Sequence, residues 1–117
     1  MLKKFICFAV LMVLLMGMVA GCGTKKAETV KIGFIGPLTG GNAAIGIGLK
    51  NSAELAVKQA NESGKYKTKF ELVVVDDGGD PSTAVSAANK LIADKGVVAV
   101  FGHFNSGAAL ATVPIFH

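Results

Sequence analysis

The sequence has 117 residues, of which 51% are hydrophobic and 17% are charged, with 12 Lys+Arg against 8 Asp+Glu. This composition indicates a globular or membrane-associated protein and excludes a disordered one. All the basic residues are lysines, and the absence of arginine, the residue best suited to fork onto bases and phosphates, disfavours nucleic-acid binding.

The N-terminus has the layout of a secretory signal peptide, which we predict over residues 1–21. Two lysines precede about sixteen apolar residues, fewer than the roughly 20 that a membrane-spanning helix needs. The segment ends in Val19-Ala20-Gly21-Cys22, which resembles the lipobox of bacterial lipoproteins. The resemblance implies that Cys22 is lipidated and becomes the new N-terminus; the alternative is a plain signal anchor with an incidental cysteine. Because Cys7 lies in the segment to be removed, we expect neither a disulfide nor a metal site built on cysteines.

Residues 22–29 are polar and lack periodicity, and we predict a tether there. From residue 30 onward, apolar runs alternate with stretches of helical periodicity. The run Val73-Val74-Val75 is continuous, as in strands buried on both faces of a parallel sheet. The predicted strands cover residues 30–35, 70–75 and 97–101, and the predicted helices cover 46–63, 81–95 and a segment from about 106.

Capping residues, glycines and a proline mark the ends of these predicted helices, and apolar stripes mark their inward faces. Asp80 fits an N-cap with proline after it, and glycines at 64 and 96 are expected stops. Pro114 should kink or end the last helix. Helical spacing predicts two inward-facing stripes, which are Leu49, Ala53, Ala56, Val57 and Ala60 in the first helix and Ala84, Val85, Ala88, Leu91 and Ile92 in the second.

The alternation of elements predicts an α/β fold. A βαβαβα order with right-handed crossovers gives a doubly wound parallel sheet. Three strands alone leave an exposed edge, so we expect residues 30–117 to be part of a longer fold.

The glycine-rich segment over residues 36–48 follows the first strand, as phosphate-binding loops do, but it lacks their other residues. Neither Gly41 nor Gly46 is followed by the Lys and Ser/Thr of a P-loop. A dinucleotide fingerprint is incomplete, because its third glycine position is Asn51 and the acids after the second strand lie too far along. Nucleotide binding is therefore disfavoured.

Catalysis and metal binding also have little support. The DDGGDP stretch, residues 76–81, indicates a turn that caps the second helix rather than a metal or phospho-acceptor site. His103 and His117 lack a nearby nucleophile or metal-ligand spacing, so we expect them to serve in packing or solvation. We predict no catalytic residue, no metal and no cofactor.

Three motifs together carry a family resemblance over essentially all of residues 30–117. They are IGPLTG with G-x-G before the helix, the D-x-x-x-D-P turn with AANKLI, and VFGHFNSG. With these motifs the sequence resembles the periplasmic binding protein of the branched-chain amino acid ABC transporters. The resemblance implies a considerably longer protein with two α/β lobes and a ligand cleft (periplasmic binding protein-like type I), of which this chain matches only the first part of lobe one.

The predicted ligand site lies at the carboxyl ends of the strands, where open α/β sheets bind ligands. Asn105, Ser106 and Gly107 open a helix whose free amides and dipole favour an anion. We expect the Ser106 hydroxyl to donate to a ligand α-carboxylate, with simple helix capping as the alternative. The resemblance assigns Ile45 to a position that often carries an aromatic side chain covering the ligand.

These features predict a lipid-anchored solute-binding protein on the extracytoplasmic face of the membrane, which delivers an amino acid (branched-chain or similar) to an ABC permease. Hinge closure around the ligand would be its mechanism. Because the second lobe and the hinge lie outside the matched part, this stretch alone is expected to bind ligand weakly or not at all. The alternatives are a ligand-sensing receptor module of the same fold and, less favoured, a nucleotide-binding Rossmann-type enzyme.

Overall fold

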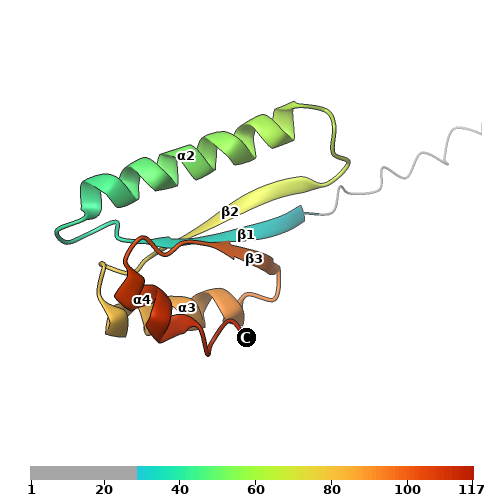
Figure 1. Cartoon of the computed structure of the whole chain (residues 1–117). Coiled ribbons are helices and arrows are strands. Elements are labelled where there is room, and N and C mark those ends of the chain that lie inside the picture. The colour runs from blue at the N-terminus through green and yellow to red at the C-terminus, as the bar shows by residue number, and fades with distance from the viewer. Residues whose placement is uncertain (1–28) are drawn as a thin grey trace, which may run out of the picture.

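The computed structural model describes residues 29–117, which form alternating strands and helices (Figure 1). The predicted signal peptide, the predicted lipidation site Cys22 and residues 22–28 of the predicted tether lie outside the described residues. The elements are β1 (Thr29–Gly36), α2 (Ala43–Glu62), β2 (Lys69–Asp76), α3 (Pro81–Ala93), β3 (Val97–Phe101) and α4 (Ser106–Thr112). The element order and types match the prediction.

The three strands form one parallel sheet in the order β2-β1-β3. β1 is central and pairs in register with β2 from Thr29↔Lys69 to Gly36↔Asp76. Helix α2 covers one face of the sheet, while α3 and α4 pack together on the other face (Figure 1). The predicted doubly wound α/β sheet is confirmed, and its geometry brings the loops after all three strands to one edge.

The main core lies between the sheet and α3. It consists of buried Ile35, Ala87, Ala88 and Leu91, with Val73, Val75, Val100 and Ile115 packed against them. The prediction for α3 was wrong at Ile92, whose side chain is 51% exposed. A helix advances about 100° per residue, so Ile92 points past the stripe centred on Leu91, and Ala87 takes the inward place.

Helix α2 packs more loosely than α3. Four residues of its predicted stripe are half-buried, namely Leu49, Ala53, Val57 and Ala60. Ala56 is exposed, contrary to the prediction. Gly46 is the buried residue of this helix. A side chain at this position would overlap the carbonyl oxygen of Pro37, so the helix can approach that loop closely only with glycine here. The first turn of α2 therefore lies directly on the loop that follows β1.

Most of the predicted helix ends agree with the structure. The Asp80 carboxylate accepts hydrogen bonds from the Ser82 and Thr83 amides at 3.0 and 2.9 Å, which confirms the predicted N-cap. Helix α3 ends two residues before its predicted end, because Asp94 leaves the helical conformation and pairs with Lys31 at 2.7 Å. Helix α4 ends at Thr112, before Pro114, as predicted.

Within residues 29–117, no helix combines the length and the apolar character that crossing a bilayer requires.

Removing the Leu91 side chain tests the assignment of the core. Leu91 is fully buried, and a Cβ placed on Gly33 of β1 would lie 3.1 Å from its methyl groups. Leu91→Ala should lower the free energy of unfolding by about 2–5 kcal/mol, because it opens a cavity between α3 and the sheet. Chemical denaturation of the purified protein measures this loss. The neighbouring exposed residue provides the control: Ile92→Ala should change the free energy far less, and equal losses would contradict the assignment.

Candidate functional site

The carboxyl edge of the sheet carries the loops in which the ligand site was predicted. Ile45 lies in the first turn of α2 with its side chain 48% exposed. The prediction had this helix beginning near residue 46, and so placed Ile45 in a loop. It begins at Ala43 because glycine at 46 serves close packing on Pro37 rather than a turn. Ile45 therefore projects from a helix.

The segment Asn105–Gly107 forms the start of α4. Asn105 is the N-cap residue but makes no side-chain cap hydrogen bond, and Ser106 and Gly107 are exposed. Asn105 Oδ1 is buried without a hydrogen-bond partner, and it would lie 3.2 Å from a Cβ on Gly79. Gly79 has a positive φ of 72°. The loop after β2 thus requires glycine at this position both for its backbone conformation and for its contact with Asn105.

Asp76 binds the loop that follows β1. Its Oδ1 accepts the Leu38 amide at 2.7 Å, the Thr39 amide at 3.3 Å and the Gly78 amide at 2.8 Å. Its Oδ2 accepts the Thr39 hydroxyl at 2.6 Å. Burial by itself would raise the pKa of the Asp76 carboxyl, but these hydrogen bonds together outweigh it and hold the pKa below its usual value.

Asp77 binds the loop that follows β3. This carboxylate is fully buried, and its Oδ2 lies 2.7 Å from Nδ1 of His103, whose side chain is only 4% exposed. The other ring nitrogen, Nε2, lies 2.8 Å from the Thr112 hydroxyl at the end of α4. Asp77, His103 and Thr112 therefore form a buried polar chain that joins the ends of β2, β3 and α4.

Sequence reasoning missed the roles of three of these residues. It treated residues 76–81 as a turn capping the next helix, but only Asp80 caps α3, while Asp76 and Asp77 bind the other two loops. It expected packing or solvation for His103, which is buried and contacts a side chain through each ring nitrogen. The available signal was that Asp77 comes one residue after β2 and His103 two residues after β3, the strands that flank β1.

The Thr112–His103–Asp77 chain has the order of a hydroxyl, imidazole and carboxylate triad, but its burial is that of a structural network. Thr112 is 1% exposed, and its hydroxyl also lies 3.1 Å from the carbonyl oxygens of Ala108 and Ala109. A nucleophile has to reach its substrate, and this hydroxyl is enclosed by its own helix. Among residues 29–117, no group of three or more His, Cys, Asp or Glu side chains is arranged to hold a metal ion.

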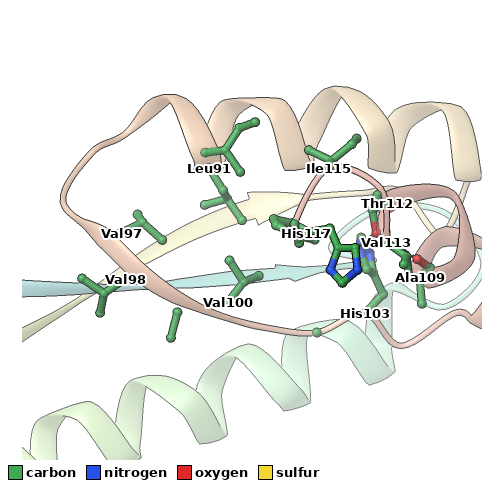
Figure 2. A pocket seen from close by; sticks show the side chains of 14 residues that line it. Leu91, Val97, Val98, Val100, His103, Ala109, Thr112, Val113, Ile115 and His117 are labelled. Carbon is green, nitrogen blue, oxygen red and sulfur yellow. Dashed lines mark hydrogen bonds between the residues drawn. The ribbon is translucent and has the colours of Figure 1, made fainter.

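Two hollows flank β3 (the larger is shown in Figure 2). The larger measures about 590 Å³ and the smaller about 310 Å³. The larger is lined by Leu91, Ile92, Val97–Val100, Gly102, His103, Ala109, Thr112, Val113 and Ile115–His117. Neither hollow is lined by Ile45, Asn105, Ser106 or Gly107. The predicted ligand residues therefore lie at the carboxyl edge, apart from the hollows along β3.

Comparison with known proteins points to one family. The family model described as "Periplasmic binding protein" matches residues 29–117. The Leu/Ile/Val-binding protein homolog 2 of Brucella abortus is 42% identical over 105 residues, which cover 89% of this chain and 28% of that protein.

Solved structures agree. The branched-chain amino acid transporter substrate binding protein of Streptococcus pneumoniae, in complex with isoleucine, is 34% identical with a TM-score of 0.69, covering 74% of this chain and 25% of that one. A solute binding protein of an ABC transporter from Rhodopseudomonas palustris, in complex with 3,4-dihydroxybenzoic acid, is 32% identical with a TM-score of 0.64, covering 74% and 24%. The chain thus spans about a quarter of the length of these proteins.

The hydrogen bonds to Asp76 predict a pH dependence of stability. A carboxyl whose folded pKa is lowered stabilises the folded state fully above its unfolded pKa, and that contribution is lost as the pH falls through the folded pKa. Asp76→Asn should therefore be less stable than the wild type at neutral pH, and the difference should shrink below about pH 4. Urea denaturation at a series of pH values measures this difference. The exposed residue Glu71 supplies the control, since Glu71→Gln should leave stability at neutral pH near that of the wild type; a difference for Asp76→Asn that does not change with pH would contradict the assignment.

Proposed function

The chain belongs to the periplasmic binding protein family, and from this we propose that it is the ligand-contacting first part of an extracytoplasmic solute-binding protein that delivers a branched-chain or similar amino acid to an ABC permease. The observation that carries the proposal is the carboxyl edge itself. Its loops are tied together by Asp76 and Asp77, while Ser106, the first residue of α4, remains exposed. The names of the relatives supply the class of ligand and the transporter.

A carboxylate is the ligand group that this edge suits best. Isoleucine and 3,4-dihydroxybenzoic acid, the molecules bound to two solved relatives, differ in size and polarity but share a carboxylic acid group. We propose that this group is received by the segment Asn105–Gly107, with the Ser106 hydroxyl donating a charged hydrogen bond. Ile45, half exposed on α2, would pack against the apolar part of the solute.

The proposal includes an anchor at the N-terminus. Cys22 would carry the lipid after removal of residues 1–21, and residues 22–29 would lead from the lipid to β1. β1 begins at Thr29, the last residue of this segment, so the folded part starts where the tether ends. A short tether would hold the domain close to a permease in the same membrane.

Calorimetric titration tests the ligand. The full-length product of the gene encoding this chain should bind at least one of leucine, isoleucine or valine, and polar amino acids more weakly. Ser106→Ala should weaken that binding by about ten- to a hundredfold, because a hydrogen bond to a charged group contributes about 1.5–3 kcal/mol. Ser86 lies on the exposed side of α3, so Ser86→Ala serves as the matched control and should bind as the wild type does. If no amino acid gave a measurable heat of binding, the proposed ligand class would be wrong.

Metabolic labelling with a radioactive fatty acid in a bacterial host tests the anchor. The wild type should incorporate the label and Cys22→Ala should not, because the lipid is attached through the Cys22 thiol. Cys7→Ala is the matched cysteine control and should be labelled like the wild type, since Cys7 would be removed with the signal peptide. Equal labelling of wild type and Cys22→Ala would contradict lipidation at this position.

A further inference from the structure

Two consecutive carboxylates stand at the end of β2, Asp76 as its last residue and Asp77 directly after it, and they bind different loops. Asp76 accepts hydrogen bonds from Leu38 and Thr39, in the loop that leads from β1 to α2. Asp77 binds His103, in the loop that leads from β3 to α4. Successive side chains of a strand point to opposite faces of the sheet. Because α2 lies on one face and α4 on the other, adjacent acids can serve the loops that lead to both helices (Figure 1).

We propose that Asp76 and Asp77 form a two-sided clamp of positioning residues, which fixes the two loops that present the ligand contacts. The inference rests on the proposed function for the identity of those contacts. Asp76 holds the loop beneath the first turn of α2, from which Ile45 projects. Asp77 holds the loop that ends in Asn105 and Ser106.

The Asp77 side of the clamp reaches its loop by two routes. Through His103, it fixes the residue three positions before Ser106, and the second ring nitrogen continues to Thr112, six positions after it. Through its Oδ1, it accepts the Gly79 amide at 2.8 Å, and Gly79 lies against Asn105. The start of α4 is therefore held from both directions along the chain.

Burial strengthens the hydrogen bonds of Asp77. Asp77 is fully buried, Thr112 is 1% exposed and the His103 side chain 4%, so water does not compete for their hydrogen bonds. Oδ2 of Asp77 engages Nδ1 of His103, and Nε2 on the other side of the ring faces the Thr112 hydroxyl. Each ring nitrogen thus has its own partner, and rotation of the ring would break both contacts.

Asp80 shows what an acid of the same turn does without a positioning role. Its carboxylate accepts the amides of Ser82 and Thr83 and the Thr83 hydroxyl, all within the first turn of α3. It therefore stabilises its own helix, whereas Asp76 and Asp77 bind chain segments more than 25 residues away. This difference makes Asp80 the matched control.

Hydrogen exchange of backbone amides tests the clamp without any ligand, in the full-length gene product. Asp76→Asn should raise exchange at the amides of Leu38 and Thr39, whose hydrogen bonds Asp76 accepts, and leave residues 109–113, whose amides are hydrogen-bonded in α4, near the wild-type rates. Asp77→Asn should do the reverse, because each carboxylate holds a different loop. Asp80→Asn should change neither region. A rise spread evenly over the whole domain in both acid variants would overturn the proposal, since it would show a general loss of stability.

Two substitutions at His103 separate its ring nitrogens. The amide of Asn can take the place of Nδ1 and keep the Asp77 contact, whereas the longer Gln can take the place of Nε2 and keep the Thr112 contact. We expect His103→Asn to retain more protection at the hydrogen-bonded amides of residues 109–113 than His103→Gln, because Asp77 ties the loop to the sheet. Equal losses would overturn the role of Asp77. If neither variant folds, Thr112→Val provides the comparison: it removes the hydroxyl that contacts His103 but keeps the Asp77 contact, and it should affect residues 109–113 less than Asp77→Asn does.

Affinity distinguishes the clamp from the proposed function. For a solute that the wild type binds, Asp76→Asn and Asp77→Asn should each weaken binding by about tenfold, because loops that are no longer preorganised must be ordered on binding. Unchanged affinity with raised local exchange would overturn the clamp. If the wild type binds none of the solutes tested, the proposed function fails, and the exchange pattern alone decides whether the two acids position their loops.

Discussion

The central position of β1 governs the arrangement of the described residues. This strand pairs with β2 on one side and β3 on the other, and both pairings are parallel. Parallel pairing requires crossovers, which place α2 on one face and α3 on the other. It also brings the ends of all three strands to one edge. Every polar contact of the candidate site follows from that edge, because the loops of residues 37–42, 77–80 and 102–105 meet there.

The polar side chains buried at the carboxyl edge supply hydrogen-bond partners for one another. A buried carboxylate without partners is strongly destabilising, and Asp77 lies fully inside the fold. Its oxygens are satisfied by His103 and the Gly79 amide, and the histidine is satisfied in turn by Thr112. Removing His103 would take one hydrogen-bond partner from both Asp77 and Thr112 inside the fold, so the network favours one arrangement of the loops. Asn105 Oδ1 is the buried side-chain atom within residues 29–117 that remains without a partner.

Much of the fold could be predicted from local patterns, because the forces that set it are local. The strands were predicted to within one residue at most ends, since their β-branched apolar runs are bounded by turn residues. The start of α2 was predicted too late, because residues 43–45 were assigned to the glycine-rich loop, whereas they begin the helix, which packs on Pro37 at Gly46. The prediction placed Ile92 on the inward side of α3 because the residue is hydrophobic, but its angle around the helix leaves it exposed.

The candidate site was less predictable because its contacts are long-range. Asp77 and His103 are 26 residues apart, and Asp76 and Thr39 are 37 apart, so no periodicity connects them. The segment Asn105–Gly107 could be placed at the carboxyl edge from strand order alone, but its attachment through His103 to two other elements could not. The hollows along β3, which the sequence did not indicate, are lined mainly by apolar side chains.

The two kinds of edge in this sheet present different chemistry. Along β3, Val98 and Phe101 are exposed at 69% and 52%, beside the two hollows, which makes that side suited to contact with apolar surface. At the carboxyl ends, the exposed residues include Thr39 and Ser106 beside Ile45 and Phe104, and the loops that carry them are held by Asp76 and Asp77. A group that donates hydrogen bonds from a fixed position favours a small polar ligand, because the ordering has already taken place on folding. The polar edge, rather than the larger apolar hollow, is therefore where recognition of a small charged group is best supported by physical chemistry.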